Sequence, residues 1–357
     1  MKFYLLIFSF CLSFLFVKSE GYTYNLDKKI KSYLSEEDGL YWFKIVNQDR
    51  SNIINYFPKN FSKNGDVDYS KILQKAINEN SNIILPNFPI AVNYNGLNLK
   101  SNSKITFQEN SQLVMLPNSY GNHQIFLIKD VENVEIVNAN LKGERFLHKG
   151  TTGEWGMGIN ILSSKFVKII NPRISEFWGD GIYIGRSSNG ISFCQDIVVK
   201  GGELTRNRRN GISIVSGKNI SISDILIKNT SGASPMAGID LEPNRSDEFL
   251  YNITLSNVTT ENNKIDGIKI VFHRLINNKN VLVNIDNHKD IGSRNPLTIV
   301  GVNSMKNSSL QGSVVYTNGK WNKANSKIRI QKEIAPTLKL DIKKVNINGI
   351  FYNKSIK

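Results

Sequence analysis

Short apolar segments alternate with polar bends along most of the chain, and two kinds of segment recur at regular intervals. The first kind is a Gly-Ile pair followed by alternating polar and apolar residues, and it starts at Gly158, Gly181, Gly211, Gly238 and Gly267. The second kind is an apolar segment whose fifth residue is Asn, Gly or Asp, and it ends at Asn138, Asn171, Gly201, Asp224 and Asn257. Recurrence at intervals of about 20–50 residues is typical of repeat architectures.

The two kinds of segment keep a common register. The interval from the second kind to the first is ten residues in three repeats, fourteen from Asp224 to Gly238, and twenty from Asn138 to Gly158. The additional residues therefore fall in a few loops, while the segments between them keep their spacing. Strand-like alternation with almost no helical periodicity predicts coils made of several short β-strands separated by bends.

The residue types at the bends and inside the strands explain how such coils can stack. Asn, Gly and Asp tolerate the left-handed backbone conformation that a two-residue bend requires, and stacked Asn side chains can hydrogen-bond along the axis. The isoleucines at positions 159, 182, 212, 239 and 268 would form one inward column in a stack with a spacing of about 4.8 Å. The pattern predicts an all-β fold, a parallel β-helix. A leucine-rich horseshoe would need an L-x-x-L-x-L pattern, and a two-sheet sandwich would not keep this register.

The N-terminal part of the chain departs from the repeat. Residues 1–19 combine a charged start with an apolar run from Phe3 to Val17, which predicts a signal peptide and a secreted or periplasmic location. Residues 20–60 fit no repeat, and residues 61–357 are assigned to the β-helix domain. Within this domain, residues 66–80 show one apolar helical face and predict an N-terminal helix that caps the solenoid.

Charge and cysteine content narrow the partners. The formal net charge is +15, which favours anionic partners, and for an exported protein we expect these to be acidic polysaccharides. The sequence carries no nucleic-acid-binding motif, and no segment after the signal peptide is apolar enough to cross a bilayer. Removing the signal peptide leaves Cys194 as the only cysteine, so no intramolecular disulfide can form and Cys194 is expected to fill the core.

Part of the chain resembles a known group of proteins. The stretch NGDVDYSKILQKAINENSNIILPNFPIAV resembles the opening of pectate-lyase-superfamily right-handed parallel β-helix proteins, in which a Gly-Asp turn and a capping helix precede a strand ending in Leu-Pro. The later blocks GEWGMGI, FWGDGIYIG, NRRNGISI and AGIDLEPN are similar to bacterial members of that group. The resemblance runs from about Asn64 to Val271. It implies the fold rather than the reaction, because relatives include lyases, hydrolases, epimerases and non-catalytic adhesins.

Two departures from this group concern its chemistry. Polygalacturonase-type hydrolases carry an Asn-Thr-Asp, then an Asp-Asp, then a Gly-His-Gly, on successive coils. Here Asp180 matches the first position loosely, the second reads Arg209-Asn210-Gly211, and the histidine is missing. The Asp pattern of the calcium site of the main pectate lyases is not evident either. Bound Ca²⁺ would be compatible with the carboxylates but is not indicated, no zinc-ligand spacing is present, and we expect no cofactor.

Ionisable side chains concentrate on one face of the predicted coils. If the isoleucines point inward, strand alternation directs the residue after each outward, and Asp240, Glu242, Tyr183 and Lys269 then share one face. Residues two apart on a strand are about 6.6 Å apart and two coils are about 9.6 Å apart. The Asp240–Glu242 and Asp180–Asp240 pairs are thus near the separation of about 6.5–9.5 Å that inverting glycosidases use. The predicted catalytic residues are Asp180, Asp240, Glu242, His148 and Lys269.

A long insertion before the first Gly-Ile segment adds further candidates. Its sequence, GERFLHKGTTGEWGMG, contains Glu144 and His148 together with Trp155. A tryptophan offers an apolar face for a sugar ring, an arginine offers a fork for a carboxylate, and a histidine can exchange protons near neutral pH. We expect the insertion to overhang a groove floored by Asp180, Tyr183, Asp240 and Glu242. The predicted substrate-binding residues are Arg145, Glu154, Trp155, Tyr183, Arg186, Arg208, Arg209 and Asn244.

These residues predict an enzyme that degrades or modifies an acidic polysaccharide. A lyase that performs β-elimination on a uronate is the first hypothesis, because the chain is basic and the polygalacturonase motifs are missing. Such a lyase needs a cation, a base and an acid, and Lys269 and the arginines can supply the cation. A glycoside hydrolase with paired carboxylates is the alternative. A C5-epimerase would use similar residues, and a non-catalytic glycan-binding surface protein is the reading from a different class.

Overall fold

The structure is a computed structural model that describes residues 51–191, 193–275, 281–301, 310–322, 328–330 and 338–356. The predicted signal peptide and residues 20–50 of the N-terminal segment lie outside this range. The described residues belong to one compact unit, Gln48–Lys357. No helix in this part of the chain is long and apolar enough to cross a bilayer.

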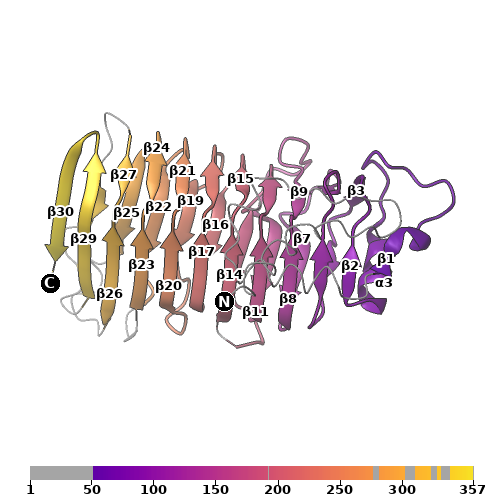
Figure 1. Cartoon of the computed structure of the whole chain (residues 1–357), viewed down its shortest axis with the longest axis horizontal. Helices are drawn as coiled ribbons and strands as arrows, with labels where there is room; N and C mark the ends of the chain where they lie inside the picture. The colour runs from indigo at the N-terminus through magenta and orange to yellow at the C-terminus, as the bar shows by residue number, and fades with distance from the viewer. Residues whose placement is uncertain are drawn as a thin grey trace, which may run out of the picture. The chain divides into compact units, whose positions relative to one another are not determined.

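Nine parallel strands form one sheet, which we call the Gly-Ile sheet because all five predicted Gly-Ile segments fall on it. In spatial order it consists of β28 (Ile328–Ile330), β25 (Asn295–Val300), β22 (Asp266–Val271), β19 (Ala237–Leu241), β16 (Asn210–Ile214), β13 (Ile182–Gly185), β10 (Trp155–Leu162), β7 (Asn122–Lys129) and β4 (Leu97–Asn98). The coils follow one another in sequence order along the stack (Figure 1).

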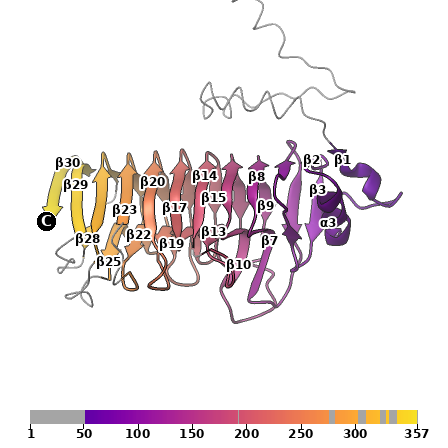
Figure 2. The same cartoon turned by 90° about the horizontal axis from the view of Figure 1, so that it is seen from below.

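Two further ladders of parallel strands complete the coils. The first ladder contains β1 (Ser51–Asn52), β2 (Asn82–Ile84), β5 (Lys104–Thr106), β8 (Glu132–Val137), β11 (Lys165–Ile170), β14 (Cys194–Lys200), β17 (Gly217–Ser223), β20 (Leu250–Ser256), β23 (Val281–Asp286), β26 (Gly312–Thr317) and β29 (Leu338–Ile347). The second contains β3 (Pro89–Val92), β6 (Gln112–Met115), β9 (Asn140–Lys142), β12 (Arg173–Ser175), β15 (Glu203–Thr205), β18 (Leu226–Lys228), β21 (Thr259–Glu261), β24 (Lys289–Ile291) and β27 (Lys320–Trp321). The Gly-Ile sheet and the first ladder form separate faces (Figure 2).

The register of the Gly-Ile sheet is the one that the repeat predicts. Ile159, Ile182, Ile212, Ile239 and Ile268 pair in successive strands, and each of them is 0% exposed. The glycines before them form one line, because a β-carbon on any of the first four would lie 2.6–2.8 Å from the carbonyl oxygen of the next glycine. A side chain at these glycines would therefore separate the coils.

The bends after the first-ladder strands also confirm the predicted backbone geometry. Asn138, Asn171, Asp224 and Asn257 all have positive φ, between 51° and 56°, in the left-handed region that these residues tolerate best. Their side chains hydrogen-bond from coil to coil. Asn171 Nδ2 donates to Asn138 Oδ1 at 3.0 Å, and Asn257 Nδ2 donates to Asp224 Oδ1 at 2.9 Å. Asn or Asp at these positions thus adopts the backbone conformation of the bend and also forms the hydrogen bond between coils.

One continuous apolar core runs inside the coils from Ile53 to Val345. Cys194 belongs to it, fully buried, and burial raises the pKa of its thiol to about 12. A thiol with this pKa stays protonated near neutral pH, so the prediction that Cys194 is a core filler is confirmed.

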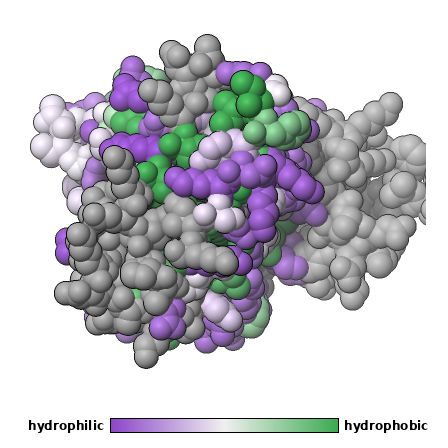
Figure 3. Space-filling model, turned by 90° about the vertical axis from the view of Figure 1, so that its left-hand side faces the viewer, coloured by the Kyte–Doolittle hydropathy of each residue, from purple (hydrophilic) through white to green (hydrophobic). Residues whose placement is uncertain are grey.

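Short elements stand at the two ends of the described stack. Near the first coils lie η1 (Ile53–Tyr56) and α3 (Ser70–Glu79), and α3 buries Leu73, Ala76 and Ile77 in the core cluster. A helix is therefore present where the sequence places one, and its role as a cap stays a prediction. At the C-terminal end, β29 pairs antiparallel with β30 (Ile350–Ile356). That end face exposes apolar patches among polar residues (Figure 3).

Candidate functional site

The predicted outward column lies on the Gly-Ile sheet in continuous register. Asn160 pairs with Tyr183, Tyr183 with Ser213, Ser213 with Asp240, and Asp240 with Lys269. Glu242 follows two residues after Asp240, and its backbone N–H donates to the carbonyl of Ile214. The carboxyls of Asp240 and Glu242 therefore lie on the same face of the same strand region, as the alternation predicts. They are close enough to hydrogen-bond to each other, which is closer than the separation of about 6.5–9.5 Å expected from the sequence.

Two adjoining pockets lie over this face. One has a volume of about 210 Å³ and is lined by Glu154, Trp155, Tyr183, Arg209, Ser213, Val215, Asp240, Glu242 and Asn244. The other, of about 360 Å³, is lined by Asn122, Trp155, Met157, Asn160, Leu162, Tyr183 and Arg186. Trp155 and Tyr183 line both pockets, and Trp155 is 51% exposed. We call the first the acidic pocket and the second the tryptophan pocket.

Asp240 and Glu242 differ sharply in their protonation. Burial raises the pKa of Asp240 well above its usual range, and the negative charge of Glu242 adds to the rise. Burial would also raise the pKa of Glu242. Lys269, whose Nζ lies 3.0 Å from Glu242 Oε2, lowers it together with the hydrogen bond to Asp240 and the charge of Arg209, and the net pKa is lowered. Asp240 therefore keeps its proton to a higher pH than Glu242 does. Environments that separate two carboxyl pKa values in this way define an acid and a base.

Asp180 lies behind the pocket wall. It is 0% exposed and accepts hydrogen bonds from Ser213 Oγ at 2.7 Å and from the backbone N–H of Asn210 at 2.9 Å. Arg209 Nη1 donates to its second oxygen at 3.0 Å. Burial raises the pKa of Asp180, and Arg209 opposes the rise. The expected place of Asp180 on the groove floor is thus corrected, because this carboxylate holds Arg209, which itself lines the acidic pocket.

Two polar residues that the sequence analysis did not select connect these carboxyls. Asn210 stands between the coils of Asp180 and Asp240, and its Nδ2 donates to Ser213 Oγ at 3.0 Å and to Asp240 Oδ2 at 3.3 Å. The side chains of Asp240 and Glu242 also hydrogen-bond to each other, which raises the pKa of Asp240 and lowers the pKa of Glu242. The signal for Ser213 was its place directly after Ile212, in the outward column that also contains Asp240. The signal for Asn210 was its place directly before Gly211, because Asp180 likewise stands directly before Gly181.

The insertion contributes fewer pocket residues than the sequence predicts. Glu154 and Trp155 do line the acidic pocket, and Glu154 Oε2 lies 3.7 Å from Arg209 Nε. Arg145, by contrast, donates to the backbone oxygens of Arg206 and Asn207 and to Ser231 Oγ. Its guanidinium therefore joins the insertion to later coils and is not among the groups that line the two pockets.

Arg208 and His148 also lie outside the two pockets. Arg208 donates to the carbonyls of Gly153 and Trp178 and lies over the Trp178 ring at 3.7 Å. The His148 ring stacks on the same indole, with 3.9 Å between ring centroids, and its side chain is 0% exposed. The expected overhang of His148 over the groove is therefore corrected, because its ring is enclosed between the insertion and the coil.

The remaining candidates lie at the pocket edges. Arg186 lines the tryptophan pocket and forms an ion pair with Asp247. Asn244 lines the acidic pocket, and Glu248 accepts a hydrogen bond from its backbone N–H at 2.6 Å. Lys269 does not line either pocket, although its side chain is within 3.9 Å of Asp240 Oδ1. Lys269 therefore contacts the two carboxyls from the neighbouring coil.

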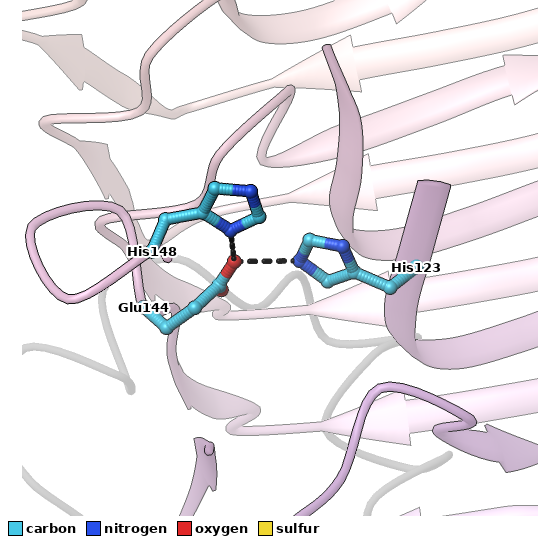
Figure 4. A group of neighbouring side chains, drawn as sticks. All are labelled: His123, Glu144 and His148. Carbon is cyan, nitrogen blue, oxygen red and sulfur yellow. Dashed lines mark hydrogen bonds and ion pairs between the residues drawn. The ribbon is translucent and has the colours of Figure 1, made fainter. Parts of the chain in front are cut away.

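Among the described residues, one group has the donor atoms for a metal ion. It consists of His123, Glu144 and His148, whose ligand atoms all lie within 4.8 Å of one another. Figure 4 shows the Glu144 carboxylate between the two imidazole rings. The sequence analysis named no metal site, because His123 is separated from the other two in the sequence. The available signal was the four-residue spacing of Glu144 and His148.

Comparisons with known proteins identify distant relatives. No protein-family model matches the chain. It is 30% identical over 187 residues to the uncharacterized protein YclG of Bacillus subtilis (strain 168), and 29% identical over 180 residues to YorA, an SPbeta prophage-derived uncharacterized protein of the same organism. The matches cover 48% and 45% of this chain. The chain spans about a third of the length of these relatives, 32% and 31%.

Solved structures share the fold at low sequence identity. The N-terminal fragment of bacteriophage Phi29 gene product 12 gives a TM-score of 0.59 at 14% identity, covering 80% of this chain and 49% of its own. A tailspike protein of E. coli bacteriophage HK620 gives 0.58 at 12%, covering 85% and 61%. An iota-carrageenase complexed to iota-carrageenan fragments gives 0.55 at 17%, covering 78% and 61%. This chain is a right-handed parallel β-helix protein, which confirms the resemblance at the level of the fold.

Proposed function

We propose that this protein is a secreted carbohydrate-active enzyme that hydrolyses glycosidic bonds in a polysaccharide. One observation carries the proposal. Two neighbouring carboxyls in the acidic pocket have pKa values shifted in opposite directions, upward for Asp240 and downward for Glu242. Glycoside hydrolysis requires such a pair, with a protonated acid for the leaving oxygen and an ionised carboxylate for water or the anomeric carbon.

Each pocket residue would have a distinct task. Asp240 would give its proton to the glycosidic oxygen, and Glu242, kept ionised by Lys269, would act as base or nucleophile. Asp180 would act as a positioning residue, since it orients Arg209 beside the pocket. The exposed indole of Trp155 offers a flat apolar surface to a sugar ring at the junction of the two pockets.

The fold neighbours support a polysaccharide as substrate. One of them is an iota-carrageenase complexed to iota-carrageenan fragments. A groove of two adjoining pockets suits several linked sugars better than one small molecule. The net charge of +15 favours an anionic glycan, and the predicted signal peptide favours action outside the cytoplasm. These four observations are independent of the acid–base assignment.

A uronate lyase is the second candidate, and Arg209 is the observation that favours it. Arg209 lines the acidic pocket and could neutralise a substrate carboxylate, as an elimination requires. We rank hydrolysis first because the cations of this site already have anionic partners. Arg209 pairs with Asp180, and Lys269 pairs with Glu242. The charges of Arg209 and Lys269 are then largely neutralised and less able to stabilise the carboxylate of a uronate.

The test is incubation of the purified protein with a panel of neutral and acidic polysaccharides. New reducing ends without the ultraviolet absorbance of an unsaturated uronate would support hydrolysis, and both signals together would support the lyase. Asp240→Asn and Glu242→Gln should abolish turnover. Glu203→Gln removes a carboxyl that pairs with a lysine on the second ladder, and it should leave turnover unchanged. Glycan binding without either signal would contradict the enzyme and favour a binding protein.

A further inference from the structure

A second chemical site lies beside the pockets, where the insertion meets the Gly-Ile sheet. His123 stands near the start of β7, while Glu144 and His148 come from the insertion (Figure 4). Glu144 Oε1 lies 2.8 Å from His123 Nε2 and 2.9 Å from His148 Nδ1. All three side chains are 0% exposed. A carboxylate fully removed from water needs a positive partner of comparable charge.

One hydrogen bond determines which nitrogen of the neutral His123 ring carries the hydrogen. Its Nδ1 lies 2.7 Å from the carbonyl oxygen of Tyr120, and because a carbonyl can only accept, Nδ1 carries the hydrogen. In the neutral ring Nε2 is then a lone pair, and it faces the Glu144 carboxylate. These two atoms, 2.8 Å apart, need a positive charge between them, which either a proton on Nε2 or a bound metal ion supplies. Buried Nε2 forms no hydrogen bond of good geometry, which leaves this nitrogen available as a metal ligand.

We propose that His123, Glu144 and His148 bind a divalent transition-metal ion of the zinc class. Two imidazoles and one carboxylate are a ligand set that Zn²⁺ uses, with a fourth position left for water. Tetrahedral ligands about 2.0–2.1 Å from an ion lie about 3.4 Å apart, so the donor atoms, now 2.8 and 2.9 Å apart, need to separate only slightly. Oxygen-preferring Ca²⁺ does not suit this set.

The surroundings hold the two rings in place for this role. Metal-bound histidines usually donate their other N–H to a carbonyl, and His123 does so to Tyr120. Gly156 pairs with His123 in the neighbouring strand, and a β-carbon there would lie 2.5 Å from His123 Cε1. The His148 ring is held on one side by stacking on Trp178. The coil and the insertion thus leave room for an imidazole at each position.

The bound ion would fasten the insertion to the solenoid. The insertion includes Glu154 and Trp155, which line the acidic pocket. The carbonyl of Gly153, one residue earlier, accepts a hydrogen bond from Arg208 at 3.0 Å. An ion between Glu144, His148 and His123 would therefore order the segment that presents the indole to a ligand. This role requires binding alone and does not depend on the proposed hydrolysis.

The test is metal binding by the intact protein. Chelator-treated protein is titrated with Zn²⁺, and separately with Ca²⁺, by calorimetry and by equilibrium dialysis with elemental analysis. We expect one equivalent of Zn²⁺ per chain, no comparable Ca²⁺ binding, and a higher unfolding temperature with Zn²⁺. The proposal is overturned if the wild-type protein binds no stoichiometric Zn²⁺. The three side chains would then be held together by protein contacts alone.

Variants locate the ion. His123→Gln, Glu144→Gln and His148→Gln should each lower Zn²⁺ affinity by more than the roughly 10–100-fold that losing an outer partner costs. His273→Gln, which changes an exposed histidine, is the matched control and should bind like wild type. Circular dichroism checks each fold. If one variant fails to fold, the other two still decide the question. Folded ligand variants that bind Zn²⁺ as tightly as wild type would refute the site.

Discussion

Replacing Asp240 by Asn should remove activity and at the same time stabilise the fold. Asp240 is 1% exposed, and burial, together with the negative charge of Glu242, raises its pKa well above the usual range. Ionising this carboxyl is therefore costly in the folded chain but not in the unfolded chain. An amide avoids that cost, keeps the shape, and can still accept the hydrogen bond from Asn210. Changes that relieve a strained active site commonly stabilise by about 0.5–2 kcal/mol.

The pH dependence gives the sign of this effect. Because the folded state raises the pKa of Asp240, its contribution to stability is fully present below the ordinary aspartate pKa of about 3.9. It is lost as the pH rises through the folded-state pKa, since the unfolded chain releases the proton first. The advantage of Asp240→Asn should thus be present at neutral pH and disappear in acid.

Chemical denaturation at neutral and acidic pH, together with turnover on a cleaved glycan, measures both effects. Asp224→Asn is the matched control, because Asn suits its bend, where φ is 56°, and can still accept the hydrogen bond from Asn257. We expect no gain in stability there. The reasoning fails if Asp240→Asn is less stable than wild type at neutral pH, or if its advantage persists unchanged in acid.

Three further changes test the fold and the pockets. Ile212→Asp puts an unpaired carboxyl in a fully buried column position and should cost several kcal/mol; near-normal thermal stability would contradict the register. Asn171→Ala should destabilise by about 2–3 kcal/mol in a melting series, from left-handed strain and a lost hydrogen bond, whereas Asn171→Gly should restore the bend and recover much of the loss. Trp155→Ala should raise KM more than it lowers kcat, and unchanged glycan affinity would remove the indole from the substrate path.

The sequence by itself determined the coil and its register. The repeat is local, so each bend residue favours the same backbone conformation, and each inward isoleucine the same buried position, in every coil. In-register stacking then places Asp240 opposite Ser213 and Lys269. Strand alternation alone was enough to put Glu242 on the same face, and the positive φ of Asn171 follows from its residue type. These features depend on neighbours along the chain or exactly one coil away.

Tertiary structure alone decided which of the outward groups face solvent and what charge they hold. Asp180 is enclosed because Arg209 and Ser213 of the next coil close over it, and no pattern along one strand specifies that. His148 is buried because the path of the insertion brings Glu144 beside His123 of an earlier coil. The opposite pKa shifts of Asp240 and Glu242 arise from burial and from the position of one ammonium group. Repetition fixes where backbones stack, whereas loop paths and side-chain contacts between distant segments fix the chemistry.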